Sequence, residues 1–127
     1  MKKIEAIIKP SKLSNVKDAL HEIGLSGMTV SDVKGFGRQR GQDGGLNSVN
    51  DYDDEFRVKI KIELIIEDKM VEKALEAIKN AAYSGKIGDG KIFIYTIDQV
   101  IRIRTGEKDS DAVLFIFTRI KKSIKRH

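Results

Sequence analysis

Hydrophobic and polar residues alternate along four segments of the chain, and each of these segments is predicted to be a β-strand. The clearest is 56–66, where every second residue is apolar and most of the intervening residues are charged. Residues 2–9 show the same alternation, and runs over 28–36 and 91–97 complete the set. A period of two is typical of a strand that buries one face, so the other face is free for chemistry.

Two other segments, 11–23 and 68–82, repeat apolar residues every three or four positions, which predicts amphipathic helices. Gly24 follows the first and is its expected C-terminal stop. The order strand, helix, strand, strand, helix, strand is that of the α+β ferredoxin-like fold (βαββαβ), an antiparallel sheet with two helices on one face. The other sheet face would expose apolar residues, so this pattern also predicts self-association.

The connection between the second and third predicted strands is unusually long, polar and rich in glycine. Connections of this length in a compact domain are generally functional or disordered. We therefore expect it to become ordered on a ligand or a partner. It begins at Gly35 with the pattern G-x-G-x-x-x-G, but no helix is predicted after it, so the dinucleotide-binding site of a Rossmann fold is excluded.

Composition and charge narrow the possible functions. The chain has 127 residues, enough for one domain, and no cysteine, which excludes disulfides and thiolate chemistry. No signal-peptide stretch precedes the first strand and no apolar run could span a bilayer, so a cytoplasmic protein is expected. The net charge of +5 comes entirely from residues 113–127, which contain no acidic residue. Because the rest of the chain is balanced, a nucleic-acid partner is not expected.

The segment 84–93, SGKIGDGKIF, has the composition of an anion-binding loop. Glycines let backbone N–H groups face one concavity, and lysines add the charge that phosphates require. Gly85 to Lys91 fits most of the P-loop pattern, but Ile92 stands where a serine or threonine is needed. The segment also follows a predicted helix instead of a strand, which argues against a P-loop NTPase. Nucleotide binding by another geometry stays open.

Several segments together resemble a single family. They are MKKIEAIIKP at 1–10, GMTVSDVKGFGRQRG at 27–41, KIEL at 61–64, GKIGDGKIF at 85–93 and VIRIRTGE at 100–107. On these segments the chain is similar to members of the PII nitrogen-regulatory signal-transduction family, from residue 1 to about 113. The resemblance implies a PII-type ferredoxin-like domain over 1–113, with the family's T-loop at about 37–55, and a C-terminal extension over 114–127.

The resemblance implies a regulator that is not an enzyme. Such proteins are homotrimers that bind ATP or ADP in the clefts between subunits and 2-oxoglutarate beside Mg-ATP. Their T-loop then docks on or releases a target, which here would be an ammonium transporter or an enzyme of nitrogen metabolism. The protein would reach a membrane only peripherally, through a transporter partner.

The resemblance also assigns the nucleotide contacts. Adenine and ribose would be surrounded by Gly27, Met28, Thr29 and Glu63, with Gly35, Phe36, Gly37 and Arg38 beside the nucleotide. The phosphates would lie on the loop residues Ser84, Gly85, Lys86, Ile87, Gly88, Asp89, Gly90 and Lys91, and on Arg102 and Arg104.

The two arginines alternate with Ile101 and Ile103, so we expect both guanidiniums on one strand face, where they can clamp phosphates bidentately. By the resemblance, Gln39 would ligate magnesium, because an amide oxygen suits a hard cation. The keto-acid would contact Gln39, Gly41 and the ammonium of Lys59.

The long loop departs from the family pattern. It has one extra residue and lacks the stretch Tyr-Arg-Gly-x-Glu-Tyr, so the identity of the target stays open. Tyr52 and Ser48 are candidate sites of modification, near positions that relatives uridylylate or phosphorylate. An unmodified Tyr52 that serves as a contact residue is the alternative.

The extension 114–127 continues a stripe of apolar residues at helical spacing, with basic residues mostly away from it. The stripe consists of Val113, Phe117, Ile120 and Ile124. Three interpretations remain: a helix packed on its own trimer, a helix at the surface of an anionic membrane, and a docking helix for a partner.

Two alternative functions differ from the leading hypothesis of an adenylate and 2-oxoglutarate sensor. The first is a divergent PII-like module that distinguishes ATP from ADP without a response to 2-oxoglutarate. The second is a phosphotransferring enzyme, although the chain has no Ser-His-Asp or Cys-His set.

Overall fold

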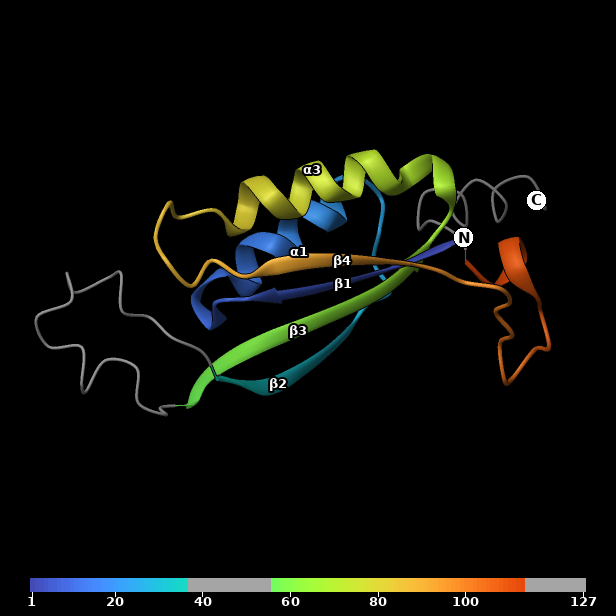
Figure 1. Ribbon diagram of the computed structural model, residues 1–127. Helices are drawn as coiled ribbons and strands as arrows, with labels where there is room; N and C mark the ends of the chain where they lie inside the picture. Colours follow the sequence, from blue (N-terminus) through green and yellow to red (C-terminus); the bar gives the residue numbers. More distant parts are fainter. Residues whose placement is uncertain (37–55, 114–127) are drawn as a thin grey trace, which may run out of the picture.

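A computed structural model describes residues 1–36 and 56–113. It contains one antiparallel sheet of four strands in the order β2-β3-β1-β4 (Figure 1). The strands are β1 (Lys2–Ile8), β2 (Thr29–Phe36), β3 (Phe56–Ile66) and β4 (Lys91–Thr96). This is the ferredoxin-like fold that the sequence pattern predicts.

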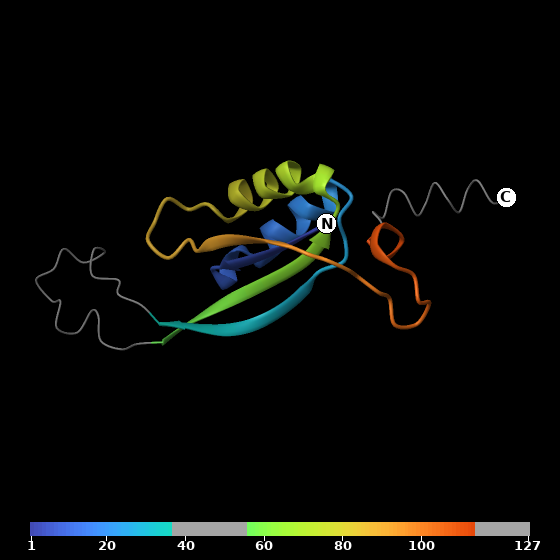
Figure 2. The same ribbon diagram turned by 45° about the vertical axis from the view of Figure 1, so that its right-hand side comes forward.

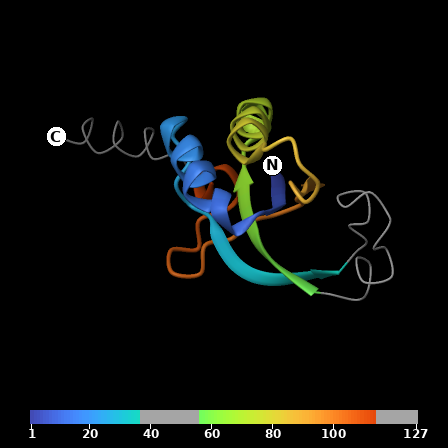
Figure 3. The same ribbon diagram turned by 90° about the vertical axis from the view of Figure 1, so that its left-hand side faces the viewer.

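Helices α1 (Leu13–Glu22) and α3 (Val71–Ala82) lie side by side on one face of the sheet, as the end-on view shows (Figure 3). Both begin later than the pattern predicts, because the residues before them form 3-10 turns, η1 (Pro10–Lys12) and η3 (Asp68–Met70). A third turn, η4 (Asp109–Ala112), lies near the C-terminal end. Among the described residues, no helix is long and apolar enough to cross a membrane.

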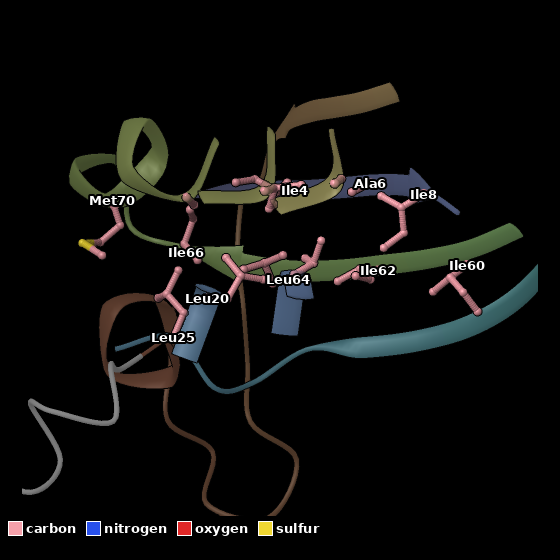
Figure 4. Packing of buried hydrophobic residues seen from close by; sticks show 14 residues of the cluster. Ile4, Ala6, Ile8, Leu20, Leu25, Ile60, Ile62, Leu64, Ile66 and Met70 are labelled. Atoms are coloured by element: carbon pink, nitrogen blue, oxygen red, sulfur yellow. The ribbon is translucent and has the colours of Figure 1, made fainter. Parts of the chain in front are cut away.

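The core lies between the helices and the covered face of the sheet (Figure 4). Ile4 of β1 and Ile62 of β3 are fully buried there, facing Leu20 of α1 and Ile78 of α3. The alternation predicted for β1 and β3 is therefore confirmed over most of their length.

The first residues of β3 leave this core. Phe56 and Val58 share the covered face but are 62% and 55% exposed. β2 and β3 extend as a narrow ribbon beyond the helices (Figure 1). At its tip Phe56 packs on Phe36, with ring centroids 5.3 Å apart.

The register of the paired strands places the connecting segments at two ends of the sheet. At one end Lys2 pairs with Ile66 and Thr96, and the C-terminal segment 97–113 continues from there. At the other end lie the start of β4, the loop 83–90 and the ribbon of β2 and β3 (Figure 2). Each end carries one of the two cavities described below.

The uncovered face of the sheet is partly apolar. Phe93 and Tyr95 of β4 lie on it, 43% and 44% exposed, opposite Glu5 and Lys3 of β1. The prediction that copies of the chain associate through this face stays a prediction.

Candidate functional site

The loop between α3 and β4 is organised by the carboxylate of Asp89. It accepts hydrogen bonds from the backbone N–H groups of Ser84 at 2.8 Å and Gly85 at 2.9 Å, and from the Ser84 hydroxyl. Lys9, directly after β1, places its ammonium 3.3 Å from the same carboxylate and 3.0 Å from the Ser84 hydroxyl oxygen. The Asp89 side chain thus connects the end of the loop with its start, and it links the loop to Lys9 at the end of β1.

These donors stabilise the ionised carboxylate. The hydrogen bond from the Ser84 hydroxyl, followed by that from the Ser84 N–H, holds the pKa of Asp89 well below its usual range. Because Asp89 uses the N–H groups of Ser84 and Gly85, these two amides are engaged within the loop. The expectation that successive amides face one bound anion therefore does not hold for these two, and for the rest of the loop it stays a prediction.

The end of the loop passes very close to β1. Gly90 has a φ of +101°, and a Cβ atom there would lie 1.7 Å from the carbonyl oxygen of Ile7. Only glycine combines this conformation with this contact. The contact fixes the position of Gly90 against β1, directly before β4 begins at Lys91.

A basic cavity of about 450 Å³ opens between this loop and the ribbon of β2 and β3. We call it the basic cavity because four of its nine lining residues are cationic. Its lining consists of Gly35, Phe36, Arg57, Lys59, Lys86, Gly88, Asp89, Gly90 and Lys91.

Lys59 joins the two walls of the basic cavity. Its ammonium donates a hydrogen bond to the carbonyl oxygen of Gly88 at 2.6 Å. Partial burial, followed by repulsion from Lys9 and Arg57, lowers the pKa of Lys59. A bound anion would relieve this repulsion, so the electrostatics of the cavity favour an anionic ligand.

A second cavity, of about 620 Å³, lies at the opposite end of the sheet. We call it the C-terminal cavity, because Val100, Arg102, Ala112 and Val113 form one of its walls. Its other lining residues are Lys3, Leu25, Ser26, Gly27, Met28, Thr29, Glu63, Leu64, Ile65 and Ile66. Figure 4 shows Leu25 beside the coil that contains η4. The mixture of apolar and charged groups suits a ligand with a flat apolar part and polar edges.

Arg102 and Arg104 do not share a strand face, so that expectation is wrong. Ile101 and Lys108 form an isolated bridge, and the N–H of Gly106 donates to the carbonyl of Arg102 at 2.8 Å. The chain therefore turns directly after Arg102. Arg102 lines the C-terminal cavity, whereas Arg104 lies exposed in the turn.

Comparisons with known proteins identify the family. Residues 1–107 match the family model for the nitrogen regulatory protein P-II. The chain is 61% identical to the nitrogen regulatory protein P-II of Rhodospirillum rubrum and 57% identical to that of Azospirillum brasilense. Each alignment spans 113 residues, which is 89% of this chain and the whole of the relative. The chain belongs to the PII family.

A solved PII structure has the same fold. The Arabidopsis thaliana PII protein bound to citrate superimposes with a TM-score of 0.72 at 40% identity, and the match covers 87% of this chain and 90% of that one. The family identity establishes a role in nitrogen regulation and signal transduction through target proteins. The relatives are named as regulatory proteins.

The structure divides the PII site residues predicted from sequence between the two cavities. In the basic cavity it brings together Gly35, Phe36, Lys59, Lys86, Gly88, Asp89, Gly90 and Lys91. In the C-terminal cavity it brings together Gly27, Met28, Thr29, Glu63 and Arg102. Ser84, Gly85 and Ile87 belong to the loop but not to the cavity lining. Gly37, Arg38, Gln39, Gly41, Ser48 and Tyr52 lie outside the described residues.

Sequence reasoning missed three cationic residues. Arg57 lines the basic cavity, and its place two residues before Lys59 on the polar face of β3 was the available signal. Lys9 holds the loop through Asp89, a contact across 80 positions that no local pattern reveals. Lys3 forms an ion pair with Glu63 at 2.7 Å in the lining of the C-terminal cavity, and the bond to Lys3 lowers the pKa of Glu63.

We predict that Gly90→Ala destabilises the protein and distorts the basic cavity. The added methyl group meets the Ile7 carbonyl, and the left-handed conformation alone costs about 1–2 kcal/mol for a non-glycine residue. Urea unfolding measures the loss, and amide shifts of residues 84–91 report the distortion. The matched control is Gly27→Ala, where a Cβ atom meets nothing within 4 Å. Equal stability of the two variants would contradict the close contact.

Proposed function

We propose that this PII protein is a homotrimeric sensor of ATP, ADP and 2-oxoglutarate, with its nucleotide sites in the clefts between subunits. The observation that carries the proposal is the division of the site residues between two cavities of complementary chemistry at opposite ends of one sheet. In this proposal residues 1–113 are the PII-type domain and residues 114–127 are an extension.

The basic cavity suits the phosphates of the nucleotide. Lys86 and Lys91 flank the Gly88 and Gly90 backbone, and Lys59 faces the same space. A triphosphate needs several cations to replace the water that it loses, and charge-assisted hydrogen bonds from lysine and backbone N–H groups supply that stabilisation. Asp89 does not oppose the anion strongly, because Lys9 and the loop donors already neutralise its charge.

The C-terminal cavity suits the base and the ribose. Leu64, Met28 and Val100 provide apolar surface for a flat ring, and Glu63 provides a carboxylate for a hydroxyl or amino group. Arg102 stands at this cavity and would reach the phosphates.

Within a single chain the two cavities are set apart along the sheet and do not face each other. They lie at opposite ends of the sheet, and β1 alone spans seven residues, or roughly 20 Å of strand. A cyclic trimer solves this problem, because it can set the basic cavity of one subunit against the C-terminal cavity of the next. The partly apolar open face of the sheet, with Phe93 and Tyr95, would be buried in such an assembly.

The second effector would bind beside the phosphates. Gln39 would ligate magnesium, and 2-oxoglutarate would contact Gln39, Gly41 and the ammonium of Lys59. Lys59 now bonds to the Gly88 carbonyl, so the keto-acid would exchange that bond for a carboxylate. The citrate bound to the Arabidopsis relative supports a carboxylate effector in this family.

The bound effectors would act on the T-loop at 37–55, which begins directly after Phe36 in the wall of the basic cavity. Fixing the base of this loop shifts its population between forms that bind and forms that release a target. An ammonium transporter or a cytoplasmic enzyme of nitrogen metabolism is the target class that fits a nitrogen regulator.

Complementation between two defective variants tests the shared site. Lys91→Ala and Arg102→Ala each remove a charge-assisted contact and should weaken ATP binding about 10- to 100-fold. Mixed trimers, prepared by co-expression and purified with two tags, should recover full-affinity sites in about a third of their clefts, because in one cleft of each mixed trimer each chain supplies the residue that its neighbour lacks. Isothermal titration calorimetry counts these sites.

Two results would contradict this proposal. Mixed trimers without recovered sites would place Lys91 and Arg102 in the same site of one chain. Unchanged ATP affinity in both single variants would show that ATP binds in neither cavity.

Calorimetry with 2-oxoglutarate tests the second effector. Binding should appear only with Mg-ATP, and Lys59→Ala should weaken it about tenfold or more, because a carboxylate loses a charged partner. The matched control is Lys61→Ala, on the same face of β3 but outside the basic cavity. Normal ATP binding without any binding of 2-oxoglutarate would favour the adenylate sensor that does not respond to the keto-acid.

A further inference from the structure

Among the described residues, the basic cavity has two cations on each of two walls. On the wall that we call the loop wall, Lys86 lies in the loop between α3 and β4, and Lys91 begins β4. On the other, the strand wall, Arg57 and Lys59 come from β3. The proposed sensor uses the two loop-wall lysines for phosphates and Lys59 for the keto-acid. Arg57 has no part in it.

Arg57 and Lys59 lie on the same face of β3. They are two positions apart, so their side chains leave the strand on one side and their Cα atoms are roughly 7 Å apart. The register places Arg57 opposite Gly35 of β2 and Lys59 opposite Val33. Because glycine has no side chain, β2 places none in the space beside Arg57.

The side chain of Lys59 reaches into this space. A Cβ atom on Gly35 would lie 3.5 Å from the Cγ atom of Lys59, although Gly35 is opposite Arg57 in the register. Lys59 therefore leans along the ribbon toward Arg57. Partial burial lowers the pKa of Lys59 most, followed by repulsion from Lys9 and then from Arg57. The charges of Arg57 and Lys59 are thus close enough to affect each other.

A carboxylate is the ligand that suits this pair of cations. Two like charges near each other raise the free energy of the cavity, and an anion that contacts both lowers it. A guanidinium can donate two parallel N–H bonds to the two oxygen atoms of a carboxylate, and an ammonium adds a point charge beside them. The strand wall offers one of each.

We propose that Arg57 is a second effector-binding cation, and that its guanidinium binds the same carboxylate of the keto-acid as the ammonium of Lys59. This inference rests on the proposed function, which supplies 2-oxoglutarate as the ligand. The strand wall is then the carboxylate half of the basic cavity, and the loop wall is the phosphate half.

Isothermal titration calorimetry of full-length variants tests this role. In the presence of Mg-ATP, Arg57→Gln should weaken the binding of 2-oxoglutarate about tenfold, because the carboxylate loses a charge-assisted contact. Arg57→Lys should lose only part of this affinity, since it keeps the charge without the planar fork. Retained binding of ATP shows that each variant is folded.

The matched control is Lys34→Gln, which removes one exposed positive charge at the same end of the sheet. Lys34 pairs with Val58, so it lies on the opposite face of the ribbon, and it does not line the basic cavity. This variant should bind 2-oxoglutarate as the unchanged protein does. Arg57→Gln should change the affinity for ATP no more than Lys34→Gln does.

NMR separates a contact from an indirect effect on the cavity. The side-chain Nε–H signal of Arg57, assigned by its absence in Arg57→Gln, should shift when 2-oxoglutarate is added to the protein with Mg-ATP. An unchanged signal at saturating 2-oxoglutarate would overturn the contact.

Three calorimetric outcomes also overturn the proposal. Unchanged affinity of Arg57→Gln for 2-oxoglutarate would exclude the contact. Equal losses in Arg57→Gln and Lys34→Gln would reduce it to a general effect of positive charge. A loss of ATP affinity alone would make Arg57 a phosphate contact.

Failure of the proposed function gives a different result. If the unchanged protein binds ATP but no 2-oxoglutarate, the keto-acid is not its effector, and the role of Arg57 is refuted with it. If the unchanged protein binds neither ligand, the nucleotide sensor itself is refuted.

Discussion

The carboxylate of Asp89 is the constraint on which the basic cavity depends. It engages Ser84, Gly85 and Lys9 together, and so fixes the course of the loop between α3 and β4 before any ligand arrives. A loop that already has its binding conformation loses less conformational entropy when a ligand binds. The same bonds partly offset the charge of Asp89, the acidic group among the described residues that line the cavity, so four cationic side chains leave the lining net positive.

In the proposed sensor, the ferredoxin-like sheet would explain why a nucleotide site needs more than one chain. Antiparallel pairing sends the loop after α3 to one end of the sheet and the C-terminal segment to the other. The basic cavity and the C-terminal cavity are consequently separated within a subunit. The proposed trimer would restore their proximity, and nucleotide binding would then depend on the contact between two chains.

Much of this could be predicted from the sequence, because the informative patterns are local. The alternation of β3 and the glycines and lysines of 84–93 locate the sheet and the loop that lines the basic cavity without any structure. The pairing of Lys9 with Asp89 could not be predicted, since it depends on the register between β1 and β4. The alternation of Ile101 to Arg104 was misleading, because Gly106, with a φ of +74°, turns the chain back within five residues. Lys3, Leu25 and Val100 of the C-terminal cavity were missed, because they come from three distant parts of the chain.

Asp89 fixes the conformation of the loop between α3 and β4 before a ligand binds. The NMR titration of the Asp89 carboxyl carbon tests this most directly. In the ligand-free protein, the hydrogen bonds from Ser84 and Gly85 should keep Asp89 ionised far below the ordinary aspartate pKa of about 3.9. Because this pKa is lowered on folding, the stabilisation is present above the ordinary pKa and is lost as the pH falls through the lowered value. The expected midpoint lies well below that ordinary value, or the carboxyl group does not titrate before the protein unfolds. A midpoint at about pH 4 would show that the donors do not engage Asp89.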